Sequence, residues 1–205
     1  MTSPEVVSAV ESAAHVPVHL TRFVGRDREL EDLARLLLSA RLLTLTGAGG
    51  SGKTRLAEEL ALRCGEKFER VGWVDLTPIG DASLVAQLIA TSLHVPSRAG
   101  TTPLQALVGS LCEARALIVL DNCEHLVDAS AEVVDALLRS CPRITILATS
   151  REALGVASET AWLVPPLASA EAIQLFVERA RATLPSFSLT SANTDAVTEI
   201  CRRLD

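Results

Sequence analysis

Short runs of consecutive apolar residues recur along the chain, and longer stretches with apolar residues at every third or fourth position lie around them. Nearly continuous apolar runs of four to six residues are typical of parallel strands covered on both faces; here they cover residues 42–46, 71–76, 116–120 and 144–149, and a weaker one covers 161–164. Helical spacing predicts helices over 26–39, 53–64, 81–93, 102–113 and 124–140. This order of elements predicts an α/β fold, a doubly wound and mainly parallel sheet.

The two ends of the chain follow other patterns. Residues 1–19 show no sustained period and are expected to form a disordered leader before an α/β core over 20–167. After Pro165-Pro166, one helical face carries a series of apolar residues, namely Ile173, Phe176, Val177, Ala180 and Leu184. A second helix is expected from about 192 to the end, so 168–205 is interpreted as the beginning of a helical subdomain. Because helical pattern continues to Asp205 without a stop signal, we expect a fragment of a longer protein.

Composition and charge narrow the class of protein. The chain is 48% hydrophobic and 21% charged with a formal net charge of −6, so it has no overall basic field and direct nucleic-acid binding is not expected. The start lacks the basic residues of a secretory signal, and no apolar run approaches membrane-spanning length. These features predict a cytoplasmic protein without membrane contact. Five scattered cysteines, an odd number without a C-x-x-C pair, are expected to be reduced, without zinc or disulfide roles.

A glycine-rich segment between the first apolar run and the next helix carries the strongest chemical signal. It fits the pattern G-x-x-x-x-G-K-S/T and reads Gly47-Ala48-Gly49-Gly50-Ser51-Gly52-Lys53-Thr54. In such a P-loop, glycines let backbone N–H groups face inward at a helix N-terminus, where the dipole also favours phosphate. Lys53 supplies a compact positive charge for the β and γ phosphates, and Arg55 is a further expected contact. The pattern predicts binding of ATP or ADP.

A carboxylate at the end of the third strand is the expected metal partner. Asp121 follows the apolar residues 117–120, at the edge of a parallel sheet where ligands bind. With the Thr54 hydroxyl, it is expected to hold Mg²⁺ as a Walker B acid. Taken alone, an acid here is more often a solvated side chain or a helix cap. The upstream P-loop favours the metal role.

Hydrolysis needs a group that orients or deprotonates water, and the residue after Asp121 is the neutral Asn122. Glu124 is the best substitute for a second carboxylate, Asn122 can orient water by hydrogen bonding, and Asp75 is a distant third. Glu124 is equally well explained as a first-turn acid that stabilises a helix dipole. Fast turnover is therefore not expected.

Arg151 follows the fourth strand, again at the carboxyl edge of the sheet. From there its guanidinium can reach the γ-phosphate and distinguish ATP from ADP by a charge-assisted contact. The spacing is equally consistent with a surface arginine paired with Glu152 or another nearby acid. The sequence leaves these two interpretations open.

Several segments together resemble the ATPase modules of STAND-class P-loop proteins (ASCE/STAND type), above all the NB-ARC-like domain of large bacterial LuxR-type and AfsR-type transcriptional regulators. The resemblance covers about residue 17 to the end and rests on residues 20–29, 45–54, 120–126, 148–152 and 171–176. It implies that Phe23, Val24 and Arg26 contact the base and ribose. Without the resemblance, Phe23-Val24 is a small apolar anchor before a helix.

The resemblance also implies a switch in which ADP holds the module closed, ATP opens it, and Arg151 senses the γ-phosphate. Further domains of a parent chain and self-association on ATP binding are expected as partners. Relatives continue with a Gly-Leu-Pro-Leu element and a winged helix, which are absent here. The chain by itself is therefore expected to lack any ADP-locking contact from those parts.

Three functions are compatible with these residues. The leading one is an ATP/ADP-binding switch with slow Mg²⁺-dependent hydrolysis, part of a larger signal-responsive transcriptional regulator. A small-molecule kinase would need an arginine-bearing lid, and the segment 96–103 has only Arg98. A nucleotide-binding scaffold without turnover is the third, and Asn122 is the argument for it.

Overall fold

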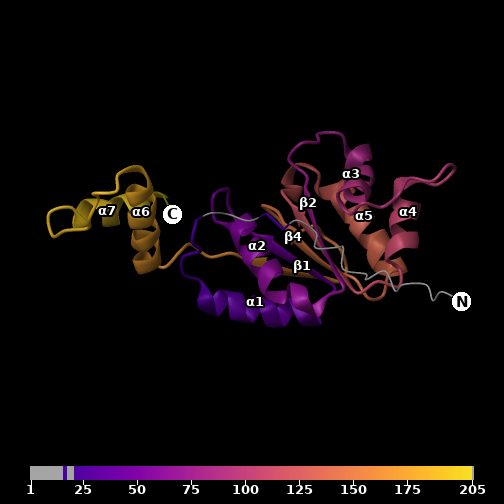
Figure 1. The fold of residues 1–205 in the computed structure, drawn as a ribbon, viewed down its shortest axis with the longest axis horizontal. Helices are drawn as coiled ribbons and strands as arrows, with labels where there is room; N and C mark the ends of the chain where they lie inside the picture. Colours follow the sequence, from indigo (N-terminus) through magenta and orange to yellow (C-terminus); the bar gives the residue numbers. More distant parts are fainter. Residues whose placement is uncertain (1–15, 18–20, 205) are drawn as a thin grey trace, which may run out of the picture.

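The described part of the protein, residues 16–17 and 21–204 of a computed structural model, contains one sheet of five parallel strands (Figure 1). The strands are β1 Leu42–Thr46, β2 Arg70–Asp75, β3 Ala116–Asp121, β4 Thr145–Thr149 and β5 Glu159–Leu163. Their order across the sheet is β2-β3-β4-β1-β5. The parallel α/β fold predicted from the apolar runs is confirmed, and β4 lies between the P-loop strand β1 and the Asp121 strand β3.

Helices cover both faces of this sheet. α1 Asp27–Ser39 and α2 Lys53–Cys64 lie on one face, and α3 Val85–Ser92, α4 Pro103–Leu111 and α5 Val127–Ser140 lie on the other (Figure 1). Successive residues of a strand point to opposite faces, so Leu117 and Val119 join the core under α1 and α2, while Ile118 and Leu120 join the core under α3 to α5. Burial on both faces explains the continuous apolar runs.

Two further helices lie beyond the sheet, on the side away from α3 to α5 (Figure 1). α6 Ser169–Thr183 and α7 Thr194–Leu204 pack together around Ala172, Val197 and Cys201. Leu184, expected on the buried stripe of α6, is instead 55% exposed, because the helix ends at Thr183. Their separation as a subdomain stays a prediction.

Some predicted boundaries were wrong. The helix expected over 124–140 is split into a 3-10 turn, Cys123–His125, and α5, because Leu126 leaves helical geometry. The helix expected over 81–93 likewise begins as a 3-10 turn at Ala82–Leu84. The expected leader lies outside the described residues apart from Val16, which packs against the α1 side of the core, and Pro17. Among the described helices, none is long and apolar enough to cross a membrane.

Candidate nucleotide-binding site

The P-loop connects β1 to α2 through two glycines with left-handed backbone. Gly50 and Gly52 have φ of 82° and 84°, a backbone conformation that is unfavourable for residues with a Cβ atom. Lys53 is buried and its Nζ donates to the carbonyls of Gly47 and Ala48, both at 2.9 Å. The Ser51 hydroxyl oxygen is buried without a hydrogen-bond partner among the described residues. A buried ammonium and an unpaired hydroxyl beside a loop at a helix N-terminus fit phosphate oxygens.

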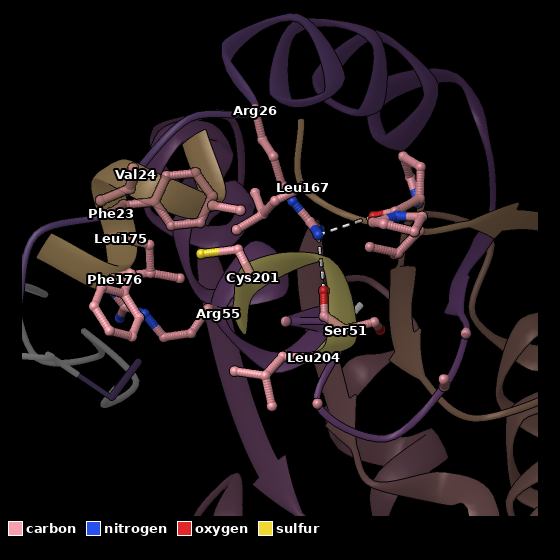
Figure 2. Close-up of a pocket in the computed structure, with 18 of the residues that line it drawn as sticks. Phe23, Val24, Arg26, Ser51, Arg55, Leu167, Leu175, Phe176, Cys201 and Leu204 are labelled. Carbon is pink, nitrogen blue, oxygen red and sulfur yellow. Dashed lines mark hydrogen bonds between the residues drawn. The ribbon is translucent and has the colours of Figure 1, made fainter. Parts of the chain in front are cut away.

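A cavity of about 770 Å³ opens beside this loop. Its walls come from the P-loop, the segment 22–26, the segment 163–167 after β5, and the helices α6 and α7 (Figure 2). The end away from the P-loop is mostly apolar, with side chains of Phe23, Val24, Leu167, Leu175 and Phe176. Its volume is in the range of pockets that enclose a small organic ligand. Phosphate chemistry at one end and apolar surface at the other suit a nucleotide.

Arg26 joins two walls of the cavity. It is buried, and its Nη2 donates to the carbonyl oxygens of Ser51 at 2.8 Å and Pro165 at 2.9 Å (Figure 2). The backbone N–H of Arg26 donates to Glu171 Oε1 of α6 at 3.2 Å. The structure thus uses the guanidinium to bind backbone carbonyls. A contact between Arg26 and the ribose stays a prediction.

The segment before α1 is also tied to its neighbours at Thr21. Arg179 of α6 donates to the Thr21 hydroxyl at 3.2 Å, and Arg55 of α2 donates to the Thr21 carbonyl at 3.1 Å. Arg55 also forms an ion pair with Glu58 at 2.9 Å. Both arginines line the cavity, as does Arg22. The cavity therefore has a positive rim that suits an anionic ligand.

The hydroxyl of Thr54 and the carboxylate of Asp121 meet, as the sequence predicted for a metal pair. Thr54 Oγ1 donates to Asp121 Oδ1 at 2.9 Å, and Thr149 of β4 donates to the same oxygen. Burial raises the pKa of Asp121 above its usual value, against the effect of these two hydrogen bonds. Hydroxyl and carboxylate oxygens are the donors that Mg²⁺ prefers, so the residues fit this ion. Residues 21–204 contain no group of three or more histidine, cysteine, aspartate or glutamate side chains that could hold a metal ion.

Glu124 and Arg151, both proposed for catalysis, contact each other. Arg151 Nε lies 3.5 Å from Glu124 Oε1, and the arginine side chain is 69% exposed. Glu124 Oε2 is buried without a hydrogen-bond partner in the described structure. Arg151 also reaches the P-loop, with Nη2 at 3.7 Å from the position of a Cβ built on Gly49. The acid beside Arg151 is therefore Glu124, and a contact between Arg151 and the γ-phosphate stays a prediction.

Sequence reasoning did not identify three parts of this site. The cavity wall from Leu163 to Leu167, the residues of α6 and α7, and the hydroxyl of Thr149 come from elements remote in sequence. The Pro165-Pro166 pair and the apolar stripe of α6 were visible signals, but they indicated only a strand end and a packed helix. Thr149 is the last residue of β4, just as Asp121 is the last residue of β3. This position at a strand end was the signal that could have identified it.

Comparison with known proteins agrees with this geometry. Residues 22–148 match the family model of the AAA ATPase domain. An uncharacterized protein of Mycobacterium tuberculosis is 46% identical over 204 residues, which are 98% of this chain and 51% of that protein. A protein of the same organism, provisionally named an HTH-type transcriptional regulator, is 46% identical over 171 residues, 83% of this chain and 19% of its own length. The chain thus spans about half the first relative and a fifth of the second.

Solved structures share the fold. The ORC2 protein of Aeropyrum pernix, in its ADPNP–ADP complexes, superposes with a TM-score of 0.58 at 19% identity, over 83% of this chain and 56% of that one. A STAND protein with a tetratricopeptide repeat sensor from Pyrococcus horikoshii gives 0.58 at 18% identity, over 96% of this chain and 29% of that one. The chain therefore belongs to the AAA ATPase domain family, and it has the P-loop fold that the resemblance to STAND proteins implied.

Proposed function

We propose that this chain is an ATP/ADP-binding switch module of a larger transcriptional regulator, with slow Mg²⁺-dependent hydrolysis. The observation that carries the proposal is the cavity that joins the P-loop to an apolar pocket under α6 and α7. Phosphates at Lys53 and Thr54 would place the base among Phe23, Val24 and the α6 side chains. Membership of an ATPase family and relatives that include a provisionally named HTH-type regulator support this assignment.

The composition of the cavity walls supports the proposed switch. One wall belongs to the core and the other to α6 and α7, so a bound nucleotide contacts both parts at once. Arg151 lies beside the P-loop, where a γ-phosphate would attract its guanidinium away from Glu124. ATP and ADP would then make different contacts with the protein. Each nucleotide can shift the balance between two arrangements of the core and the helices α6 and α7 only as far as it binds one arrangement more tightly than the other.

A scaffold that binds nucleotide without turnover is the second candidate. Asn122 cannot accept a proton, and the carboxylate of Glu124 is held in an ion pair. Glu124→Gln separates the two functions, because it is expected to leave ATP affinity intact and to lower turnover if Glu124 is the base. Equal loss of affinity and turnover would contradict that role.

Binding is tested with the two lysines of the chain, Lys53 and Lys67. Lys53→Ala is expected to weaken ATP binding at least about 100-fold in calorimetry, since charge-assisted hydrogen bonds to phosphate are worth about 1.5–3 kcal/mol each. Lys67→Ala, at an exposed site away from the cavity, is the matched control. Unchanged affinity of Lys53→Ala would refute nucleotide binding at this loop.

The nucleotide that the purified protein carries separates the functions further. Release by denaturation followed by chromatography identifies it. Retained ADP supports the switch, and retained ATP that never turns over supports the scaffold. An empty site with rapid phosphate release on addition of ATP would instead indicate an efficient enzyme and would contradict slow hydrolysis.

A further inference from the structure

Two of the five cysteines, which are scattered along the sequence, come together at one place in the fold. Cys112 directly follows α4 and Cys141 directly follows α5, and these two helices pack side by side on one face of the sheet (Figure 1). The strands that come next, β3 and β4, are neighbours in the sheet. Both helix ends therefore lie at the same edge of the sheet, and both cysteines belong to the core under α3 to α5.

The backbone carbonyl of Val108 in α4 limits the distance between the two cysteines. The N–H of Cys112 donates to the Val108 oxygen at 3.0 Å, and Sγ of Cys141 lies 3.9 Å from the same oxygen. Burial raises the pKa of the Cys141 thiol, and the nearby charge of a Cys112 thiolate raises it further, against the effect of Arg41. The Cys141 thiol thus lies against the turn of α4 that ends at Cys112.

Cys141 is held firmly, whereas Cys112 has room to adjust. Arg41 donates to the carbonyl oxygen of Cys141 at 2.7 Å and to that of Leu138 at 3.0 Å. Cys112 is partly exposed and begins the irregular segment 112–115 between α4 and β3. A disulfide requires a specific separation and direction of the two Cβ atoms. The bend at Cys112 is the part of the pair that can shift to meet this requirement.

We propose that Cys112 and Cys141, both free thiols in the structure, are a site of oxidation at which hydrogen peroxide forms an intramolecular disulfide. The exposed partner, Cys112, reacts first: its sulfur bonds to one peroxide oxygen, the O–O bond breaks, and the other oxygen leaves as water with the thiol proton. The Cys141 sulfur then bonds to the oxidised Cys112 sulfur, the S–O bond breaks, and a second water leaves. Both thiols are oxidised, and the peroxide is reduced to water.

The disulfide would close a loop that contains part of the nucleotide site. Strand β3, Asp121 and Glu124 all lie between the two cysteines in the chain. A cross-link over such a loop restricts the unfolded chain, so oxidation should hold the strand that ends in Asp121 more firmly in the sheet. Asp121 lies at the carboxyl end of β3, whereas Cys112 and Cys141 precede the amino ends of β3 and β4. The modification is therefore independent of the proposed function.

Mass spectrometry of peroxide-treated protein tests the site. The protein is reduced, freed of reductant, treated with hydrogen peroxide and then alkylated in urea. All but two of the five thiols are expected to accept iodoacetamide. Trypsin cleaves after arginine, so Cys112 leaves on the peptide 99–115 and Cys141 on the peptide 140–143. These two peptides should be recovered joined by a disulfide, from protein that remains a monomer on a non-reducing gel.

Three variants serve as controls. Cys112→Ser and Cys141→Ala each remove one partner and should abolish the joined peptides. Cys64→Ala, at a buried cysteine in the core under α1 and α2, should leave them unchanged. Cys112→Ser changes a partly exposed side chain, so it tests the pair even if the buried replacement Cys141→Ala is unstable.

Several results would overturn the proposal. All five thiols accept iodoacetamide after treatment if the pair does not react. Sulfinic acid at Cys112 with a free Cys141 would show that the two sulfur atoms do not meet. A disulfide between Cys112 of two molecules, or between Cys112 and Cys123, would show that Cys141 is not the partner.

Thermal denaturation measures the effect of the link itself. A disulfide that closes a loop of this length should raise the Tm of the oxidised protein about 10 °C above that of the reduced protein. Dithiothreitol should reverse the shift, and Cys112→Ser should not show it. A Tm that is unchanged or lower in protein with joined peptides would mean that the fold must distort to form the disulfide, which would contradict the placement of the two thiols.

Discussion

Substitution of Gly25 by alanine tests how α6 is attached to the nucleotide segment. A Cβ built on Gly25 would lie 2.3 Å from Cδ of Glu171 and 2.6 Å from its Oε2. Gly25 also has a φ of 70°, in the left-handed region. The substitution therefore imposes two separate costs, one on the local backbone and one on the contact between Glu171 and the segment 25–26.

Each cost can be estimated from the structure. Left-handed backbone costs alanine about 1–2 kcal/mol. Displacing the carboxylate breaks the hydrogen bond from the Arg26 N–H, which is worth about 1 kcal/mol. The sum of about 2–3 kcal/mol should lower the Tm by about 5–10 °C for a chain of this length. The flexible end of Glu171 can move aside, so unfolding of the whole chain is not expected.

Gly100→Ala is the matched control. Gly100 has a φ of 78° but nothing lies within 4 Å of its added Cβ, so this variant has the backbone cost alone. Its free energy of unfolding should fall about 1 kcal/mol less than that of Gly25→Ala. Urea denaturation followed by circular dichroism measures both variants.

A double-mutant cycle isolates the contact. Glu171→Ala alone should cost about 1 kcal/mol, and Gly25→Ala with Glu171→Ala should be no less stable than Gly25→Ala alone, because the hydrogen bond is already lost. The contact between the Glu171 carboxylate and the segment 25–26 would be refuted by either of two results. One is that the losses of unfolding free energy in Gly25→Ala and Glu171→Ala add up in the double variant, and the other is that Gly25→Ala and Gly100→Ala lose equal amounts.

Two other predictions concern Arg26 and the cysteines. Arg26→Lys should cost about 2 kcal/mol in unfolding free energy and weaken ATP binding, since Nη2 of Arg26 donates to two carbonyls and the lysine side chain, which is one atom shorter, does not reach both of them; equal stability in thermal denaturation would contradict the role given to the guanidinium. Cys112 should be the first thiol alkylated by iodoacetamide at pH 8, because the other four cysteines are buried. Burial raises the pKa of Cys123 to about 12, so little reactive thiolate exists there at that pH. Mass spectrometry should find one adduct on the native protein and five in urea, and early modification of Cys123 would show that the turn after β3 opens.

Much of the candidate site was predictable because it is local in sequence. The P-loop is a continuous segment, and the position of Asp121 at a strand end follows from the apolar run before it. Thr54 and Asp121 are in contact in the structure, and their binding of Mg²⁺ stays a prediction. The resemblance to a family added Phe23, Val24 and Arg26, which line the same cavity as the P-loop.

The sequence by itself determined which segments are strands and helices, and the chemistry of the loop, because hydrophobic periodicity and glycine conformation act over a few residues. Only the tertiary structure decided which strand ends meet. Insertion of β4 between β1 and β3 brings Thr149 to Asp121, and pairing of β2 with β3 brings Asp75 to Asn122. The packing of α6 likewise decided that Glu171 contacts Arg26, a residue far away in the chain. Such contacts depend on strand order and long-range packing, which local patterns do not encode.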